Sequence, residues 1–208
     1  MFAEGTRYKQ VKGVRKPRPE PFTREEIQAI INEYWRDRPE EIRNLALIVF
    51  LYRCAARIGA TLRMMPSDID WTHNLVRIYK DKGGKTRHVV LDDRAKMYLR
   101  RWANKRAQLG IGDDKPFFCA YRHGSAGNTI LESNMLRRFR NKCRLAGITR
   151  RATLHLLRHT GASELLEEGF DVATISRVLG HASIMTTYKY LHELRPDLMN
   201  VRLTQREW

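Results

Sequence analysis

The sequence predicts an α+β domain that is mainly helical and carries a small antiparallel β-sheet. Apolar residues recur at helical spacing in several long segments, among them 24–36 near the start and 153–190 near the end. Residues 75–80 and 86–91 instead alternate between two faces, as strands do, and the loop between them contains two glycines. Because such a loop is typical of a β-hairpin, we expect one small sheet beside several helices.

The chain is strongly basic. It has 208 residues, which is enough for one core of ordinary size or for a domain with an arm. Lys and Arg number 39 and Asp and Glu number 23, which gives a net charge of +16. This imbalance is typical of proteins that bind a polyanion, because each neutralised phosphate releases counterions. The alternative interpretation is a basic protein that its charge keeps soluble.

Cysteine usage and hydropathy indicate a cytoplasmic protein. Cys54, Cys119 and Cys143 are odd in number and far apart, so we expect reduced thiols rather than disulfides or a zinc site. The first residues form no apolar leader segment, and no run of about 18 apolar residues occurs. We therefore expect no signal peptide and no membrane span.

The first residues differ in character from the rest. Residues 1–21 form a basic arm that prolines interrupt, and we expect it to have no stable structure alone. It is either a disordered tail or interdomain linker, or an arm that lies along the phosphates of a nucleic acid. We expect one domain over residues 22–208, with a polar C-terminal tail from about residue 191.

The domain begins with two predicted helices. Thr23 and Glu26 form a capping box for a helix that runs to about Arg36. Pro39 opens the second helix, which is apolar nearly all round and is therefore the expected buried central helix. Arg57 follows it, and an arginine at the end of so apolar a segment needs an anionic partner or an exposed position.

Two more helices are predicted after the hairpin. Asp92 caps the first of them, which ends near Gly110, and residues 111–129 form a longer connection that contains glycines. Ser133 is the predicted cap of a strongly basic helix. Its positive residues form either a solvated face or a track for phosphates, and they are Arg137, Arg138, Arg140, Lys142 and Arg144.

The stretch 153–190 carries the most distinctive chemical pattern. Two glycines divide it into a helix, a turn, a short helix, a turn and a last helix. His155 and Arg158 are three apart, a spacing that places both on one face of a helix. His181 follows the second glycine, and Tyr190 lies in the last helix.

These residues resemble the tyrosine recombinase (phage integrase) family. Residues 155–159 (HLLRH) are similar to the family's His-x-x-Arg-His box, and the LGH sequence at 179–181, followed by two threonines and Tyr190, is similar to its next signature. In the family, the nucleophilic tyrosine lies nine residues after the histidine of this signature, which favours Tyr190 over Tyr188. The resemblance covers the chain from about Phe22 onward.

The resemblance implies a catalytic arginine before a short strand. In the family, this arginine follows an apolar helix and precedes an Asp-Ile-Asp-like strand, which identifies Arg57 ahead of residues 68–71. The family commonly has a Ser-Glu pair shortly after the arginine, and this chain has Gly59-Ala60 instead. Arg63 is the alternative, although its position fits a surface helix better.

The resemblance also implies a catalytic lysine in the β-hairpin. The family has it within a Gly-Lys-Gly-x-Lys-x-Arg-like string, and residues 81–87 (DKGGKTR) match apart from the first position. Lys82 is the matching lysine, and Lys85 is close enough to remain an alternative. A soluble turn is the simpler explanation of such a string.

By this resemblance, the chain cleaves phosphodiesters in DNA without a metal or another cofactor. Tyr190 is the expected nucleophile, and Arg57 and Arg158 clamp the phosphate through their paired guanidinium donors. Lys82 protonates the leaving 5′-oxygen. The histidines of the two signatures, His155 and His181, bind the phosphate and assist proton transfer, whereas His159 is expected to orient the site. The 3′-phosphotyrosine product keeps the energy of the broken bond, so no ATP is needed.

The expected function is a site-specific DNA recombinase of the integrase or invertase type. The alternatives are a type IB topoisomerase-like enzyme that relaxes DNA, a DNA-binding regulator whose catalysis has decayed, and a metal-dependent nuclease. The last lacks a convincing carboxylate cluster near the histidines. Only about 21 residues precede the first helix. The chain is therefore either a catalytic domain without its DNA-binding domain or a small recombinase that resembles the fimbrial-switch invertases.

The expected partners are double-stranded DNA, further copies of the chain as a dimer or tetramer on DNA, and an accessory DNA-bending protein. We expect a cytoplasmic location with the nucleoid and no membrane contact. The residues expected to contact DNA, beside the catalytic ones, are Lys85, Arg87, Arg137, Arg138, Arg140, Lys142 and Arg144.

Overall fold

The computed structural model of the chain describes residues 20–34, 37–79, 86–122, 124–181 and 183–199. The described residues are mainly helical with one small antiparallel sheet, which confirms the predicted fold class. In chain order the elements are α1 (Arg24–Asn32), α2 (Pro39–Arg53), α3 (Ile58–Leu62), the short 3-10 helix η1 (Pro66–Asp68), β1 (Ile69–Asp70), β2 (Leu75–Ile78), β3 (Arg87–Val90), α4 (Asp93–Gln108), α5 (Glu132–Leu145), α6 (Leu154–Glu167), α7 (Val172–Leu179) and α8 (Ile184–Leu194).

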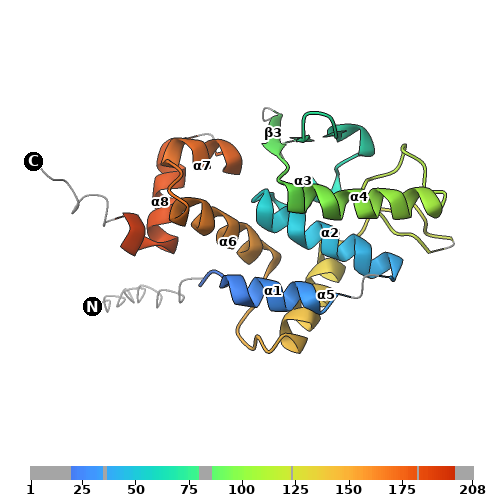
Figure 1. Ribbon diagram of the computed structural model, residues 1–208, viewed down its shortest axis with the longest axis horizontal. Coiled ribbons are helices and arrows are strands. Elements are labelled where there is room, and N and C mark those ends of the chain that lie inside the picture. The colour runs from blue at the N-terminus through green and yellow to red at the C-terminus, as the bar shows by residue number, and fades with distance from the viewer. Residues whose placement is uncertain (1–19, 35–36, 80–85, 123, 182, 200–208) are drawn as a thin grey trace, which may run out of the picture.

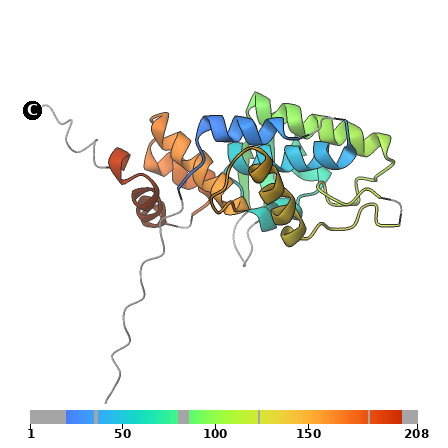
Figure 2. The same cartoon turned by 90° about the horizontal axis from the view of Figure 1, so that it is seen from below.

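The elements form two groups that lie side by side (Figure 1). The larger group contains α2, α3, α4 and the sheet, and the smaller group contains α6, α7 and α8. Figure 2, seen from below, shows α1 and α5 covering the lower side of α2. Helix α6 joins the groups, because it packs against α2 as well as against α7 and α8.

Helix α2 is the buried central helix, as its sequence predicts. Every residue from Ile42 to Tyr52 is buried. Pro39 lies in its first turn, where backbone N–H groups have no partner within the helix, so the N–H that proline lacks is not needed. Helix α4 packs along α2 with Leu99 and Trp102 fully buried, and each such side chain contributes about 1.5–3 kcal/mol on removal from water.

Helix α1 has the predicted capping box and ends earlier than predicted. The Thr23 hydroxyl accepts from the Glu26 N–H at 3.2 Å, and the Glu26 carboxylate accepts from the Thr23 N–H at 2.9 Å. The helix ends at Asn32 rather than near Arg36, because Glu33 and Tyr34 bond three residues back and so tighten the last turn. Arg36 lies outside the described residues.

The sheet has the strand order β1-β2-β3, with antiparallel neighbours. In the predicted hairpin, Leu75 pairs with Val90 and Ile78 pairs with Arg87. Both strands are shorter than the sequence suggested, and the predicted loop, with Lys82 and Lys85, lies outside the described residues. The register places Arg87 at the start of β3.

The start of the basic helix α5 corrects one prediction. Ser133 is not its cap, because the helix already begins at Glu132 and Ser133 lies within its first turn. Leu131 occupies the cap position in an extended conformation and forms no side-chain cap bond. Asp92, by contrast, caps α4 as predicted, since its carboxylate accepts from the Ala95 N–H at 2.7 Å.

The smaller group has a core of its own. Ala162 and Leu166 of α6 pack against Ile175 and Leu179 of α7 and Leu191 of α8. Helices α7 and α8 pack on α6, and α6 packs on α2, so α6 sets the position of α7 and α8 relative to α2. None of the helices in the described part of the chain is long and apolar enough to cross a membrane.

Candidate active site

One face of α6 holds the end of α2. Arg158, Gly161 and Glu164 follow one another at intervals of three and therefore share a face. Arg158 Nη1 donates to the Ala55 carbonyl at 2.6 Å, and the Tyr52 hydroxyl donates to the Glu164 carboxylate at 2.6 Å. Between these contacts, a Cβ on Gly161 would lie 2.1 Å from the Tyr52 carbonyl oxygen. Only glycine permits this approach, so the sequence fixes α6 directly against the last turn of α2.

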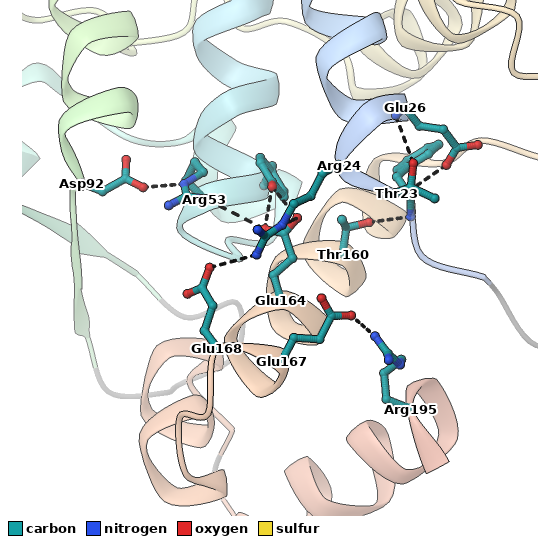
Figure 3. Close-up of polar contacts among 12 residues, drawn as sticks. Thr23, Arg24, Glu26, Arg53, Asp92, Thr160, Glu164, Glu167, Glu168 and Arg195 are labelled. Carbon is teal, nitrogen blue, oxygen red and sulfur yellow. Dashed lines mark hydrogen bonds and ion pairs between the residues drawn. The ribbon is translucent and has the colours of Figure 1, made fainter. Parts of the chain in front are cut away.

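Opposite charges balance around Glu164 (Figure 3). Its carboxylate lies 3.8 Å from Arg24 of α1 and 3.8 Å from Arg53 of α2. Arg53 also pairs with Asp92, and Arg24 lies 3.5 Å from Glu168. We call the two carboxylates of Glu164 and Asp92 and the two guanidinium groups of Arg24 and Arg53 the balanced network. It links α1, α2, α4 and α6 at the end of α2.

The chain turns sharply after α2. Ala55 has a φ of 45°, in the left-handed region that a residue with a side chain rarely adopts. The hydrogen bond from Arg158 to its carbonyl holds this conformation. Arg57 then precedes α3 in an extended conformation, near enough to Arg158 that its charge lowers the pKa of Arg158. The alternative residue, Arg63, is exposed at the other end of α3.

Arg158 is a buried cation that forms no ion pair with a carboxylate of the described residues. It is 5% exposed, and its terminal nitrogens donate to the carbonyls of Ala55 at 2.6 Å and Leu179 at 2.9 Å. Burial, and after it repulsion from Arg57, lower the pKa of Arg158 to about 9. Each terminal nitrogen carries two N–H groups, so donors remain for an anion.

His181 lies against Arg158 because of the turn that ends α7. Gly180 adopts a left-handed conformation with a φ of 63°, which redirects the chain after Leu179. Arg158 Nη2 then lies 3.3 Å from His181 Nε2, and His181 Nδ1 lies 2.8 Å from the Thr187 hydroxyl. Because arginine has only donors, Nε2 is the acceptor and Nδ1 carries the ring proton.

Tyr190 lies among these residues on α8. Its ring stacks on His159 with centroids 5.0 Å apart and meets the His181 ring edge-on at 5.6 Å. Burial raises the pKa of Tyr190 to about 12, against the attraction of Arg158 and Arg57 for the ionised form. Its buried hydroxyl interacts with the Arg158 guanidinium, which lowers the pKa against the effect of burial, although this contact does not have regular hydrogen-bond geometry. Tyr188, in contrast, is 42% exposed and stacks on His192.

His155 and Arg158 share a face of α6 but have different surroundings. His155 is exposed, whereas Arg158 is buried. His155 is close enough to His159 to lower its pKa by repulsion, in addition to the larger effect of burial, and the pKa of His159 is about 4. His155 therefore lies at the open edge of the site, and His159 lies beneath Tyr190.

Arg87, which the sequence predicted only as a general DNA contact, joins the site from the sheet. Its side chain crosses Gly180, and burial followed by repulsion from Arg57 lowers its pKa to about 10. The charge of Arg87 also lowers the pKa of Arg158. We call Arg57, Arg87 and Arg158 the cationic cluster. The only signal in the sequence was the place of Arg87 at the end of the lysine-containing string.

The basic residues of α5 have partners within the protein. Arg138 pairs with Glu40, and Lys142 pairs with Glu41 at 2.5 Å, both in the first turn of α2. The others contact α5 itself or the segment after it: Arg144 donates to Asn141 at 2.9 Å and Arg140 donates to the Ala152 carbonyl at 3.1 Å. Arg137 is the exception among them, and it is exposed.

Lys82 and Lys85 lie outside the described residues, so the predicted lysine cannot be located relative to Tyr190. Within the described ranges, no three or more His, Cys, Asp and Glu side chains gather as ligands for a metal ion.

The chain matches a family model and named relatives. The model described as the phage integrase family matches residues 20–195. A tyrosine recombinase XerC of Chlamydia caviae is 30% identical over 184 residues, which are 88% of this chain and 58% of the relative. A tyrosine recombinase XerD of Mycobacterium tuberculosis is 32% identical over 189 residues, which are 85% of this chain and 59% of the relative. The chain thus spans little more than half the length of these curated relatives.

Solved structures share the fold. The crystal structure of XerA recombinase has a TM-score of 0.77 and 25% identity, over 95% of this chain and 68% of that one. XerH site-specific recombinase bound to palindromic difH substrate has a TM-score of 0.70 and 23% identity, over 92% of this chain and 54% of that one, and shows a common fold only. Since the family model spans most of the chain, this protein belongs to the phage integrase family.

Proposed function

We propose that this chain is the catalytic domain of a site-specific DNA recombinase that cuts and rejoins strands through a covalent bond to Tyr190. One observation carries the proposal: Arg57, Arg158, His181 and Tyr190 come from separate segments and meet around a cluster of positive charge that no carboxylate of the described residues neutralises. Such a site is suited to a phosphate with a nucleophile beside it. The relatives named as recombinases support the same function.

In the proposed reaction, the Tyr190 oxygen attacks the phosphorus of one phosphodiester. The bond from phosphorus to the 5′-oxygen breaks, and the bond from phosphorus to the tyrosine oxygen forms. The tyrosine loses its proton, and the leaving 5′-oxygen gains one. In the second half, a 5′-hydroxyl of a partner strand attacks the phosphotyrosine and releases Tyr190, so no external energy source enters.

The arginines would hold the phosphate and stabilise the charge that develops on it. Arg158 is held at two points by the carbonyls of Ala55 and Leu179, so its remaining N–H groups point in fixed directions. Such preorganised donors act most strongly where charge increases in the transition state. Arg57 would supply a second guanidinium from the turn after α2.

The histidines and the lysine would handle protons and orientation. His181, with its ring oriented by the Thr187 hydroxyl, would take up a proton at Nε2 and, once protonated, donate a hydrogen bond to a nonbridging oxygen. His155 would contribute from the exposed edge. By family resemblance, Lys82 would protonate the 5′-oxygen. The pKa of Tyr190 near 12 implies a neutral phenol before reaction, so the arginines would favour its ionisation as the bond to phosphorus forms.

We also propose the domain organisation, the partners and the location of the chain. Residues 22–208 would form the catalytic domain, and residues 1–21 would be an arm or linker. The partners would be double-stranded DNA, other copies of the chain on DNA and an accessory bending protein, in the nucleoid. Of the basic residues, Lys85, Arg137 and Arg144 remain proposed DNA contacts, and Arg138, Arg140 and Lys142 would have to exchange or share the partners they have now.

The test is a covalent trap. The protein, with EDTA present, is mixed with duplexes from the DNA that flanks its own gene, nicked near each candidate site so that the cut strand diffuses away. We expect an adduct that survives SDS in the native protein and in Tyr188→Phe, and none in Tyr190→Phe. An adduct that only Tyr188→Phe abolishes would overturn the assignment of the nucleophile. A product assay on supercoiled DNA then separates recombination from simple relaxation.

A further inference from the structure

We propose that Arg87 binds the scissile phosphate together with Arg57 and Arg158 and stabilises the negative charge of the transition state. The inference rests on the proposed function. It goes beyond the expectation from sequence, in which Arg87 was one of several general DNA contacts.

The position of Arg87 is set by β3 and by Gly180. Arg87 is the first residue of β3, and its side chain lies over the turn between α7 and α8. A Cβ on Gly180 would lie 2.5 Å from Arg87 Cδ and 2.7 Å from Arg87 Nε. The same turn presents the Leu179 carbonyl and His181 to Arg158. Arg87 and Arg158 thus border one turn.

The Arg87 guanidinium has a donor without an acceptor. Its Nη1 atom is buried and has no hydrogen-bond partner, and no carboxylate of the described residues forms an ion pair with it. Arg87 as a whole is half-buried, and the fully buried Arg43 shows the ordinary solution: it donates to the Cys119 carbonyl at 3.0 Å and to the Asn44 side chain at 2.8 Å. Burying a cationic donor without a partner costs free energy. The unmatched donor of Arg87 therefore indicates an acceptor that arrives from outside the described chain.

The charge of the cluster indicates what that acceptor is. Arg57 lowers the pKa of Arg87, and Arg57 and Arg87 both lower the pKa of Arg158, so the three cations repel one another. An anion at their centre relieves this repulsion. A phosphodiester carries one negative charge, and its pentacoordinate transition state gathers about one more on the nonbridging oxygens. A third guanidinium is therefore matched to the transition state more than to the bound substrate.

The first test compares rates of adduct formation on the nicked duplex that the native protein cleaves. Arg87→Ala is expected to slow the reaction by about 100-fold, as loss of one preorganised donor does elsewhere, with DNA affinity nearly unchanged. Arg87→Lys keeps the charge without the paired donors and should recover part of the rate. The control is Arg94→Ala, which removes one positive charge from an exposed position on α4 and should stay within about twofold of the native rate.

The second test separates a phosphate contact from a structural role. Replacing one nonbridging oxygen of the scissile phosphate by methyl gives a methylphosphonate, which lacks the negative charge on which Arg87 is proposed to act. On the preferred diastereomer, Arg87→Ala should form the adduct less than about fivefold more slowly than the native protein. On the ordinary phosphate, the difference in rate should be about 100-fold. Equal losses on the two substrates would show that Arg87 only supports the fold, and this would overturn the inference.

The remaining outcomes also decide between the proposals. If the native protein forms the adduct and Arg87→Ala forms it at the native rate, the inference fails and the proposed function stands. If neither the native protein nor Tyr188→Phe forms an adduct on any duplex, the proposed function fails, and the inference fails with it. Should Arg87→Ala lose its fold by circular dichroism, the same pair of substrates is used with Arg87→Lys, for which a loss confined to the ordinary phosphate is expected.

Discussion

Arg158 and Glu164 lie within two turns of each other on one face of α6, and their surroundings are opposite in kind. Glu164 belongs to the balanced network, in which carboxylates and guanidinium groups neutralise one another. Arg158 belongs to the cationic cluster, in which the nearest charges, Arg57 and Arg87, have its own sign. The same helix therefore carries a site that is complete in itself and a site that still lacks a charge.

The difference separates structural residues from those that bind a ligand. A buried charge that is paired and hydrogen-bonded within the chain needs nothing further, whereas a buried charge among like charges is maintained at a cost. In this chain, the contacts of the balanced network and the close approach at Gly161 hold α6 against α2. Their stabilisation offsets the free energy that the cationic cluster costs. The balanced network can thus be broken without touching the chemistry, and Tyr190, beside the cationic cluster, can be changed without loosening the fold.

The strongest test of this contrast uses the same substitution in each region. Tyr190→Phe should abolish adduct formation and leave the free energy of unfolding unchanged or up to about 1 kcal/mol higher, because the lost hydroxyl is buried without a regular partner. Tyr52→Phe should keep the adduct and lower the free energy of unfolding by about 1–2 kcal/mol, because Glu164 loses a donor at 2.6 Å. Urea unfolding and SDS gels measure the two effects.

The contrast would be contradicted if the two variants exchanged their effects on adduct formation and stability. If Tyr52→Phe loses the adduct while its unfolding midpoint is unchanged, the balanced network takes part in the chemistry. If Tyr190→Phe is strongly destabilised, its hydroxyl has a structural role that the geometry does not indicate.

Gly161→Ala should damage both regions at once. The new Cβ would lie 2.1 Å from the Tyr52 carbonyl, which is backbone and cannot turn aside. We expect a loss of about 2–3 kcal/mol in stability. Adduct formation should also slow, because α6 would carry Arg158 away from the turn that bears Arg57. Ser163→Ala on the same helix is the control: its buried hydroxyl has no partner among the described residues, so the change should stay within about 0.5 kcal/mol. Equal stability in the two variants would show that α6 and α2 adjust freely.

The sequence indicated those helices and candidate site residues whose pattern is local along the chain. Arg158, His181 and Tyr190 were identified from motif spacing, and the central helix and its cap chemistry followed from the apolar pattern. Arg57 was identified although its neighbours Gly59 and Ala60 departed from the family pattern. The structure brings these four residues together, and their catalytic roles stay predictions. The fold prediction is confirmed because periodicity is a property of the chain itself.

The parts that the sequence could not give depend on contacts between distant segments. Nothing local indicates that Arg87 crosses Gly180, because the two are brought together by the packing of the sheet against α7. The basic run on α5 suggested a continuous track, but Glu40 and Glu41, far away in sequence, take up Arg138 and Lys142. The start of α5 was misplaced because Ser133 is a common cap residue and a leucine at the cap position gives no signal.

A smaller effect is expected from charge removal in the balanced network. Glu164→Gln keeps an oxygen for the Tyr52 hydroxyl but no longer neutralises Arg24 and Arg53, so we expect a loss of about 1–3 kcal/mol in stability. Glu168→Gln is the matched control, because Glu168 is exposed and meets Arg24 only at 3.5 Å, and its effect should stay below about 0.5 kcal/mol. Thermal unfolding at low and high salt measures the loss of stability in the two variants. Similar losses in both would show that the burial of Glu164 does not strengthen its ion pairs.

The smallest effect is a pH dependence at His159, which lies beneath Tyr190 beside the cationic cluster. The pKa of His159 is about 4 in the folded protein and 6.5 without burial, so between these values the unfolded chain binds a proton that the folded chain does not. Above pH 6.5, His159 is neutral in both states and does not affect the free energy of unfolding. As the pH drops toward 4, the free energy of unfolding falls by about 1–2 kcal/mol after allowance for solvent screening. His159→Phe keeps a ring to stack on Tyr190 and should flatten this part of the profile. His192→Phe, at an exposed ring stacked on Tyr188, should leave the slope as it is. If His159→Phe leaves the pH dependence of the free energy of unfolding unchanged, another group titrates in this range, and protonation beside the cationic cluster does not affect stability.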